Sequence, residues 1–276
     1  MSRSLVLLSL TTLLTAVEVE PAKLATADAA PVDPGALEIA FGLTHTQART
    51  LFDADRLRQD RGSVGRETAL GLGLTYGVME NLDVGVGLGV ARVQESDGDP
   101  DHGAGLQDVD LGAKWAFWSH GEGDRSCAVA LLPGITIPTG TRDDTPDTIP
   151  TGSRAWAVGL TLATSGQVGP WSLNADIGQS QYQGSEEDRE GTRGSTAANG
   201  AIGLAVTPWL QPEVDLSWSQ DQVEEGDAPW AVTLTAGAQV TLESGRLSLG
   251  LAQVIAGAQD TDATLTLLAG FAIIVE

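Results

Sequence analysis

Long stretches in which apolar and polar residues alternate are the feature that most restricts how this chain can fold. Between residues 230 and 243, every even position is apolar, whereas the odd positions carry mostly Ala, Thr, Gly and Gln. Successive side chains of a β-strand point to opposite faces, so a period of two predicts a strand with one apolar face. The stretch is far longer than the usual globular strand of about five or six residues.

The same alternation recurs along the chain and predicts twelve strands. We place them at about 36–46, 64–76, 82–94, 106–118, 126–138, 153–165, 170–182, 197–207, 210–220, 229–242, 245–256 and 263–275. Segment 126–138 departs most from the pattern, because Pro133 and Pro138 each lack the N–H that a ladder needs. We therefore expect a β-bulge near Pro133.

The links between the predicted strands alternate between short and long. The short links are Gly77–Asn81, Ser119–Arg125, Gly166–Gly169, Pro208–Trp209 and Glu243–Ser244. The long, polar links include Gln47–Ser63, Glu95–Gly105, Thr139–Gly152, Gln183–Thr196 and Asp221–Ala228. This arrangement predicts an all-β fold, a twelve-stranded antiparallel transmembrane β-barrel of the outer-membrane type, with short periplasmic turns and long extracellular loops.

A soluble barrel or sandwich would alternate too, but its outer face would carry Lys and Glu. Here the polar positions are mostly Gly, Ala, Thr and Ser. Aromatic residues fall near both ends of the predicted strands, as the two interfacial girdles of a membrane barrel require. The short-turn rim has Tyr76, Trp115, Phe117, Trp171, Trp209 and Phe271, and the long-loop rim has Trp156, Tyr182, Trp218 and Trp230.

The N-terminus has the pattern of a secretory signal, with Arg3 ahead of a mostly apolar run from Leu5 to Leu14. A spanning helix needs about 20 residues, so this run is too short for one. We predict a signal peptide over 1–16, with later cleavage up to residue 29 as an alternative. Residues 17–34 are then a linker or small N-terminal extension, and 35–276 form the barrel.

Charge and cysteine content exclude several classes of function. The chain has 15 Lys and Arg against 37 Asp and Glu, a formal net charge of −22. Nucleic-acid binding needs a basic footprint, so we expect none. The single cysteine, Cys127, excludes an intramolecular disulfide and a thiolate metal site.

Three stretches resemble the outer-membrane transporter family known as "MetA-pathway of phenol degradation". They are Tyr76–Leu88, Gly105–Trp115 and Gly134–Gly140. The likeness is strongest over about residues 70–140, and the second half is similar only in its strand pattern. The resemblance implies an outer-membrane barrel that passes small, aromatic or apolar compounds, and it implies no catalytic residue.

If the apolar positions face lipid, the opposite positions face an acidic lumen. They carry Glu38, Glu67, Asp83, Asp108, Asp110, Asp176, Glu213 and Asp215, against Lys114 and Arg246. Asp110, Asp176 and Asp215 lie nearest mid-height, which predicts a constriction there. Lys114 is about 13 Å from Asp110 along one strand, so an acid on a neighbouring strand is its expected partner. A structural network, a cation-preferring pore and substrate binding are all compatible with this lumen.

The predicted loops raise two further possibilities. Their acidic runs are solvated faces or, alternatively, sites for Ca²⁺ or Mg²⁺, although no run has the spacing of a dedicated metal loop. The loop 47–63 carries Arg49, Arg56, Arg58 and Arg61 among apolar residues. It is an amphipathic helix facing lipid phosphates or simply a folded loop, and either this loop or residues 17–34 can fill the lumen as a plug.

An enzyme is not expected. The three histidines, His45, His102 and His120, have no nucleophile placed beside them by any motif, and the chain lacks G-x-S-x-G, H-E-x-x-H and Walker sequences. Cys127 has lipid-facing parity and is expected to act as a small apolar residue. We expect no cofactor and no metal.

Three functions fit these observations. The first is a passive outer-membrane channel for small molecules with an acidic lumen. The second is a plugged or laterally opening transporter for aromatic or apolar compounds, and the third is a structural or adhesive barrel. The expected partners are outer-membrane lipid and lipopolysaccharide, a small solute and the barrel-assembly machinery, in the outer membrane of a Gram-negative-type cell.

Overall fold

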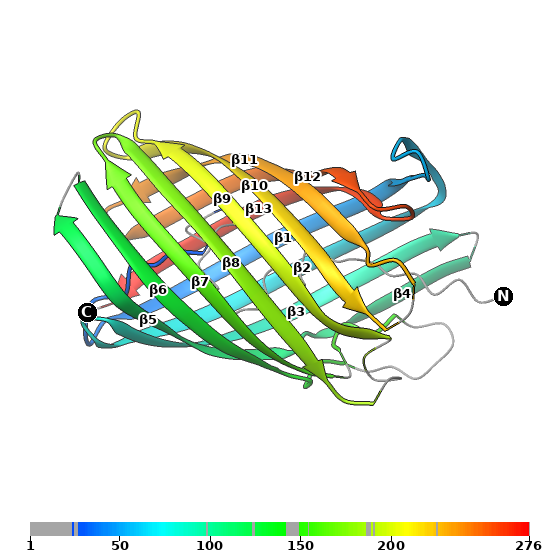
Figure 1. The fold of residues 1–276 in the computed structure, drawn as a ribbon, viewed down its shortest axis with the longest axis horizontal. Coiled ribbons are helices and arrows are strands. Elements are labelled where there is room, and N and C mark those ends of the chain that lie inside the picture. Colours follow the sequence, from blue (N-terminus) through cyan, green and yellow to red (C-terminus); the bar gives the residue numbers. More distant parts are fainter. Residues whose placement is uncertain are drawn as a thin grey trace.

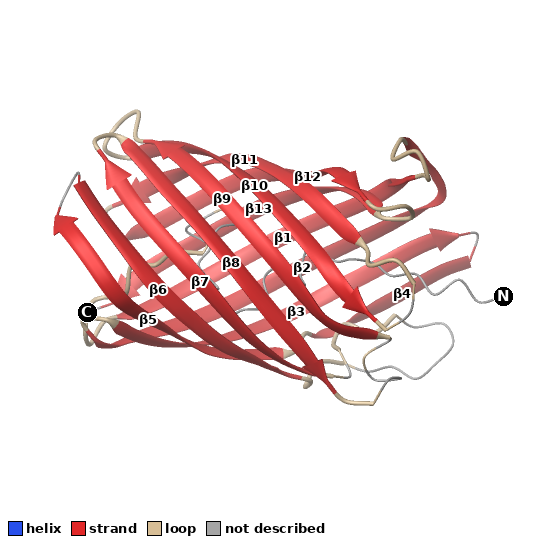
Figure 2. Cartoon of the chain, viewed as in Figure 1, coloured by secondary structure: helices blue, strands red, loops and turns tan. Residues whose placement is uncertain are grey.

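The computed structural model shows one closed antiparallel barrel built from strands (Figures 1 and 2). It describes residues 24, 27–97, 99–122, 125–141, 149–153, 155–185, 189, 191–224 and 226–275. Among these residues, no helix is both long enough and apolar enough to cross a membrane. Residues 1–16 lie outside the described part, so the division into signal, extension and barrel stays a prediction.

The described residues form thirteen β-segments that follow one another around the wall. They are β1 (Leu37–Phe52), β2 (Arg58–Met79), β3 (Leu82–Asp97), β4 (Asp99–Leu106), β5 (Val109–Glu122), β6 (Arg125–Ile137), β7 (Trp156–Val168), β8 (Trp171–Gln183), β9 (Thr192–Leu204), β10 (Leu210–Val223), β11 (Trp230–Leu242), β12 (Gly245–Gly257) and β13 (Asp262–Val275). Pairing of β1 with β13 and of β2 with β3 closes the ring.

Two of the thirteen segments make up a single wall strand. β4 pairs with Val90–Asp97 of β3, toward the long-loop rim, and β5 pairs with Leu82–Gly87, toward the short-turn rim. Both therefore lie along the same edge of β3. They are separated only at Gln107 and Asp108, where the Gln107 N–H donates to the Gly89 carbonyl at 2.8 Å. The barrel therefore has twelve strands in its wall, which confirms the predicted fold class.

The loop predicted over 47–63 is instead the outer end of the first hairpin. β1 continues to Phe52 and β2 begins at Arg58, so neither the amphipathic helix nor the long loop is present. The Asp53 carboxylate accepts the N–H groups of Asp55 and Leu57, which closes a tight turn. The predicted link Glu95–Gly105 is likewise wrong, because β3 and β4 continue through it as a hairpin.

The pairing around Pro133 has no β-bulge, whereas β5 on the neighbouring side has one. The β5–β6 register shifts between Ala116 and Trp118, whereas Pro133 faces Leu160 of β7 without any shift. A bulge adds one residue, so the consecutive side chains of Phe117 and Trp118 both face outward and are 45% and 48% exposed.

The two faces of the wall are the reverse of those in a soluble protein. On β7, Val158, Leu160 and Leu162 are exposed, whereas Thr161 and Ala163 are buried. The largest fully buried side chains of the described residues are Glu213, Thr235, Thr266, Asp83 and Asp215, all polar. An apolar belt around a polar interior is the arrangement of a transmembrane barrel.

Candidate functional site

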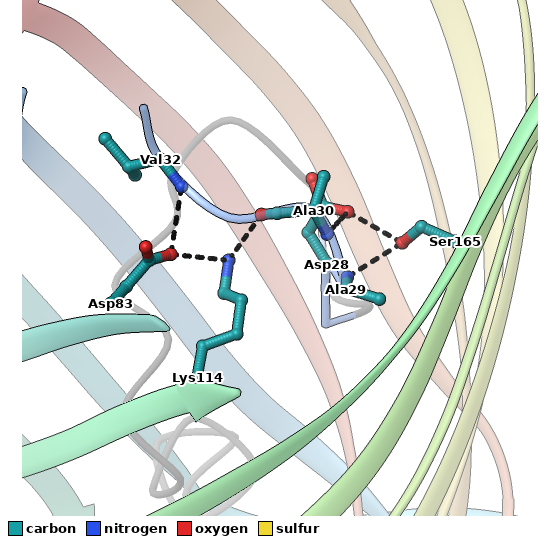
Figure 3. A network of polar contacts seen from close by, with 7 residues as sticks. All are labelled: Asp28, Ala29, Ala30, Val32, Asp83, Lys114 and Ser165. Carbon is teal, nitrogen blue, oxygen red and sulfur yellow. Dashed lines mark hydrogen bonds and ion pairs between the residues drawn. The ribbon is translucent and has the colours of Figure 1, made fainter. Parts of the chain in front are cut away.

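The lumen is the candidate functional site, and a segment of the chain ahead of β1 lies inside it (Figure 3). Residues 27–36, called the inner segment here, form hydrogen bonds with side chains of β3, β5, β7 and β8. This stretch has no strand periodicity, and Pro31 and Pro34 remove N–H donors from it. Several of its remaining backbone groups bind side chains of the wall instead.

Two wall carboxylates bind backbone N–H groups of the inner segment. The N–H of Ala27 donates to Asp176 Oδ2 at 2.9 Å, and the N–H of Val32 donates to Asp83 Oδ2 at 3.0 Å. Asn199 donates to the other oxygen of Asp176 at 2.7 Å. Hydrogen bonds to charged groups stabilise more than neutral ones, so these two acids are the main polar anchors of the segment.

Lys114 connects the same segment to the wall from β5. Its ammonium lies 3.9 Å from Asp83 Oδ2 and donates to the Ala30 carbonyl oxygen at 3.0 Å. Lys114 and Asp83 are direct cross-strand neighbours on β5 and β3. The acid on a neighbouring strand that the sequence predicted for Lys114 is therefore Asp83.

Ser165 on β7 holds the middle of the inner segment. Its hydroxyl oxygen accepts the N–H of Ala29 at 2.9 Å and donates to Asp28 Oδ1 at 2.7 Å. The same Asp28 oxygen accepts the N–H of Ala30 at 3.0 Å, which closes a local turn. Figure 3 shows these groups converging from the wall and the segment.

The side chain of Ala29 fills a hollow lined by small residues. Ala29 is fully buried against Ala116, Ala130, Leu132 and Ala163 of β5, β6 and β7. Alanine positions on three adjacent strands thus leave room for one methyl group from the segment. The neighbouring Ala30 is exposed, so the fit is specific to one position.

Glycines of the wall contact the N-terminal residues at two places, near Gly35 and near Leu24. At the short-turn rim, Gly35 donates to Gly77 O at 2.8 Å and Gly77 donates to Ala36 O at 3.0 Å. Deeper in the barrel, Leu24 lies over Gly237 and Gly250, where added β-carbons would lie 2.8 and 2.7 Å from its methyl groups. A larger residue at either glycine would require the Leu24 side chain to move.

The three acids predicted at mid-height have separate neighbours. Asp110 accepts a hydrogen bond from Thr136 Oγ1 at 2.6 Å, and Asp176 binds Ala27 and Asn199. Asp215 is fully buried on β10 opposite Thr235 of β11. Their role as a constriction stays a prediction.

The other predicted lumen residues differ in their surroundings. Glu213 is 2% exposed and accepts a hydrogen bond from Gln239 at 2.9 Å. Asp108 binds the β6–β7 connection instead: its two carboxylate oxygens accept the N–H groups of Gly140 at 2.7 Å and Ser153 at 2.6 Å. Sequence reasoning missed Ser165 and Asn199, whose inward parity was the only signal available.

The β6–β7 connection covers an edge that no strand pairs with among the described residues. Thr141 donates its N–H to the Leu106 carbonyl at 2.8 Å and accepts the Leu106 N–H at 2.9 Å through its hydroxyl oxygen. Ile149 donates to the His102 carbonyl at 3.3 Å. The outer half of the wall between β4 and β7 is therefore joined by loop contacts, and we call this place the seam.

The predicted girdle residues divide into two groups. Those about half exposed on the outer surface are Tyr76, Trp115, Trp156, Trp171 and Trp209. Trp218 and Trp230 are partly buried, and the Arg56 guanidinium lies 5.4 Å from the centre of the Trp230 ring. Trp118, turned outward by the bulge, stacks on His120 and was not among the predicted aromatics.

Within the described residues, no group of three or more His, Cys, Asp or Glu side chains is arranged to hold a metal ion. Much of the acidic loop sequence, including residues 142–148 and 186–188, lies outside that part of the chain. Among the acids of the lumen, Asp83 and Asp176 accept hydrogen bonds from the inner segment, and Asp110, Asp176 and Glu213 accept them from side chains of the wall. The lumen can therefore bind cations or hydrogen-bond donors, and in this structure the inner segment occupies it.

A family profile described as "MetA-pathway of phenol degradation" matches residues 90–243, more than half of the chain. It includes two of the quoted stretches, Gly105–Trp115 and Gly134–Gly140. It also continues through the second half, where the motifs had predicted likeness in strand pattern only. No curated protein matches the chain.

Two solved structures share the fold. An outer membrane channel from Pseudomonas putida F1 is 16% identical and has a TM-score of 0.75, with 92% of this chain and 100% of that chain covered. The β-domain of the Bordetella autotransporter BrkA is 18% identical and has a TM-score of 0.50, with 87% and 99% covered. Both are similar to this chain in their outer-membrane barrel fold.

Proposed function

The chain belongs to the "MetA-pathway of phenol degradation" family, and on this premise we propose that it is an outer-membrane channel that passes small molecules through its lumen. The inner segment keeps that lumen closed at rest, and solute passes when the segment is displaced. The observation that carries the proposal is the binding of Ala27 and Val32 by the wall acids Asp176 and Asp83. A purely structural barrel has no need of a chain segment bound across its interior.

Cations are the favoured solutes of the open lumen. The inward acids outnumber the inward bases, and acidic rings favour cations in channels. Once the segment leaves, Asp83 and Asp176 lose backbone donors and face water. Passage is passive in this proposal, and we assign no catalytic role.

Planar-bilayer currents under a KCl gradient test this proposal. We expect brief openings of the wild-type barrel, with a reversal potential that favours K⁺. Asp110→Asn, Asp176→Asn and Asp215→Asn should each weaken that preference. Glu243→Gln, which changes an exposed acid in the β11–β12 turn, is the control and should leave the preference unchanged.

One result would contradict the channel, and another would contradict the role of the lumen acids in it. One is a folded barrel that never conducts, even when the inner segment is displaced by Gly77→Ala, a variant argued in the Discussion. The other is a reversal potential that the three lumen variants leave untouched, which would remove the assignment of these acids to the conducting path. A structural or adhesive barrel would remain in the first case.

The seam favours a second candidate, transport of aromatic or apolar compounds with exit through the wall. β4 is joined to the β6–β7 connection by loop contacts, and Asp108 holds both ends of that connection. Asp108→Ala should increase uptake of labelled phenol by cells that carry the barrel, without changing K⁺ conductance. Unchanged uptake in Asp108→Ala, or uptake equal to that of cells without the barrel, would remove this candidate.

The outer membrane is the location that this function requires. The apolar belt and the family support it, and residues 1–16 are proposed to direct export across the inner membrane. Insertion by the barrel-assembly machinery and contact with lipopolysaccharide follow from that location. Fractionation of cells, with the N-terminus of the mature chain sequenced, tests both the export and the cleavage site.

A further inference from the structure

The outer face of β1–β3 carries a group of basic side chains just beyond the apolar belt. Cross-strand pairing aligns His45 with Thr68 and Thr68 with Arg92, and the next outward row aligns Gln47, Arg66 and Gln94. These positions share the parity of exposed Leu43, Leu70 and Val90, so they face out of the barrel. We call Arg49, Arg66 and Arg92, with His45, the basic patch.

Arg66 and Arg92 lie close together without an acid between them. Arg66 is opposite Gln94, so Arg92 is its diagonal neighbour, at about 7–8 Å between backbones. Within the described residues neither arginine has an ion pair, and the nearby acids Glu67 and Glu95 are buried on the lumen side of the wall. Two like charges so placed repel each other unless an anion lies between them.

Neutral side chains also hold two members of the patch, Arg49 and His45, in place. The Gln47 amide oxygen, oriented to satisfy both ends of its amide, accepts from the Arg49 guanidinium at 3.1 and 3.2 Å. His45 Nδ1 lies 2.9 Å from Thr68 Oγ1. In a chain with a net charge of −22, an outward surface that gathers arginines is unusual.

The height of the patch matches the outer boundary of the membrane. Arg66 is ten residues from Tyr76 along β2. At a rise of about 3.4 Å per residue and a tilt of about 40°, this separation is about 25 Å along the barrel axis, the height of the apolar belt of outer-membrane barrels. Since Tyr76 lies at the short-turn rim, Arg66 lies at the opposite interface.

We propose that the basic patch on β1–β3 binds the phosphate groups of lipid A, the membrane anchor of lipopolysaccharide in the outer leaflet. Guanidinium groups bind phosphate through paired N–H donors, and one phosphate between Arg66 and Arg92 neutralises both. The acyl chains of the same lipid then lie on Leu43, Leu70 and Val90. This inference rests on the outer-membrane location, and it is independent of conduction.

Lipid binding by the full-length barrel in detergent tests the proposal, with native mass spectrometry as the readout. The probes are bisphosphorylated lipid A, the same lipid A with both phosphates removed, and phosphatidylglycerol. We expect the bisphosphorylated form to bind best, and Arg66→Gln with Arg92→Gln to weaken it about tenfold. Arg125→Gln, an exposed arginine at the short-turn rim, is the control and should change nothing.

Several results would overturn the proposal. They are equal binding of the phosphorylated and dephosphorylated lipids, equal binding of phosphatidylglycerol, and equal loss in Arg125→Gln and in the double variant. The lipid series on the wild-type barrel decides the question even if the double variant does not fold. A barrel that conducts but ignores the phosphates would contradict this inference and leave the channel proposal intact.

Discussion

The backbone of Asp33 passes so close to Gly77 that a β-carbon on Gly77 would collide with the Asp33 carbonyl oxygen. The same β-carbon would lie 2.8 Å from the carbonyl oxygen of Val32. The residue at position 77 of β2, at the short-turn rim, therefore determines whether the inner segment can pack against the wall at this point. Backbone atoms cannot swing away as a flexible side chain does, so the close approach requires glycine.

Gly77→Ala should displace residues 32–36 and raise the open fraction of the channel. Overpacking costs about 1–3 kcal/mol, which corresponds to an increase of about five- to 150-fold in the displaced state. Single-channel recording measures the open fraction. Gly71→Ala on the same strand, where the nearest atom to an added β-carbon is 3.9 Å away, is the matched control. Equal behaviour of the two variants would contradict docking at Gly77.

Ala29→Leu should expel the middle of the inner segment. The hollow formed with Ala116, Ala130 and Ala163 has room for one methyl group, and the larger side chain costs about 1–3 kcal/mol of docking free energy. The wall is unchanged, so the heat-induced unfolding temperature should stay close to that of the wild type. Faster cleavage of the N-terminal residues by an added protease is the expected readout.

The control for this experiment is Ala30→Leu, at an exposed neighbouring position. It adds the same side chain to the same segment without entering the hollow, so it should leave the cleavage rate unchanged. If Ala30→Leu is cleaved as fast as Ala29→Leu, the hollow does not hold the segment.

The barrel itself could be predicted because strand alternation has a short period that assigns every residue to one face. A shift of one residue would put Glu213 and Asp215 in lipid, so the faces follow from the pattern alone. Local exceptions carried no such signal. The bulge at Phe117 has neither Gly nor Pro beside it, whereas Pro133 suggested a bulge that its pairing with Leu160 does not need.

The occupant of the lumen could be anticipated only as one of two candidates. Residues 17–34 and 47–63 were both irregular in sequence, and the second became a hairpin because Asp53 closes a turn. The partners of the inner segment depend on three-dimensional register. Lys114 meets Asp83 only because β4 and β5 part at Gln107 and Asp108, which sets the register of β5 on β3.

Lys114→Met should lower the stability of the barrel. The side chains of Lys114 and Asp83 are 6% and 1% exposed, and removing one partner of a buried pair costs about 3–5 kcal/mol. The Ala30 carbonyl loses its donor as well. The urea midpoint, followed by heat-modifiable electrophoretic mobility, measures the loss.

Adding Asp83→Asn to Lys114→Met tests whether the charge is the cause. The amide is neutral and its oxygen still accepts from Val32, so much of the lost stability should return. A double variant as unstable as Lys114→Met would mean that lost packing of the lysine stem, rather than an uncompensated carboxylate, accounts for the effect.

Glu224 should make the stability of the outer rim depend on pH. A hydrogen bond from Arg189, with Nη2 2.6 Å from Glu224 Oε1, holds the pKa of that carboxyl below its ordinary value of 4.5, and Arg193 at 3.4 Å adds to the effect. A lowered pKa stabilises the folded barrel above the unfolded value, and this contribution is lost as pH falls through the folded value. The thermal midpoint of the wild type should therefore exceed that of Glu224→Gln at pH 7, and the difference should shrink below pH 4.5 and vanish in stronger acid.

Asp227→Asn, an exposed acid in the same loop, is the control and should match the wild type. A difference between wild type and Glu224→Gln that is constant from pH 7 into strong acid would exclude the ion pair as its source.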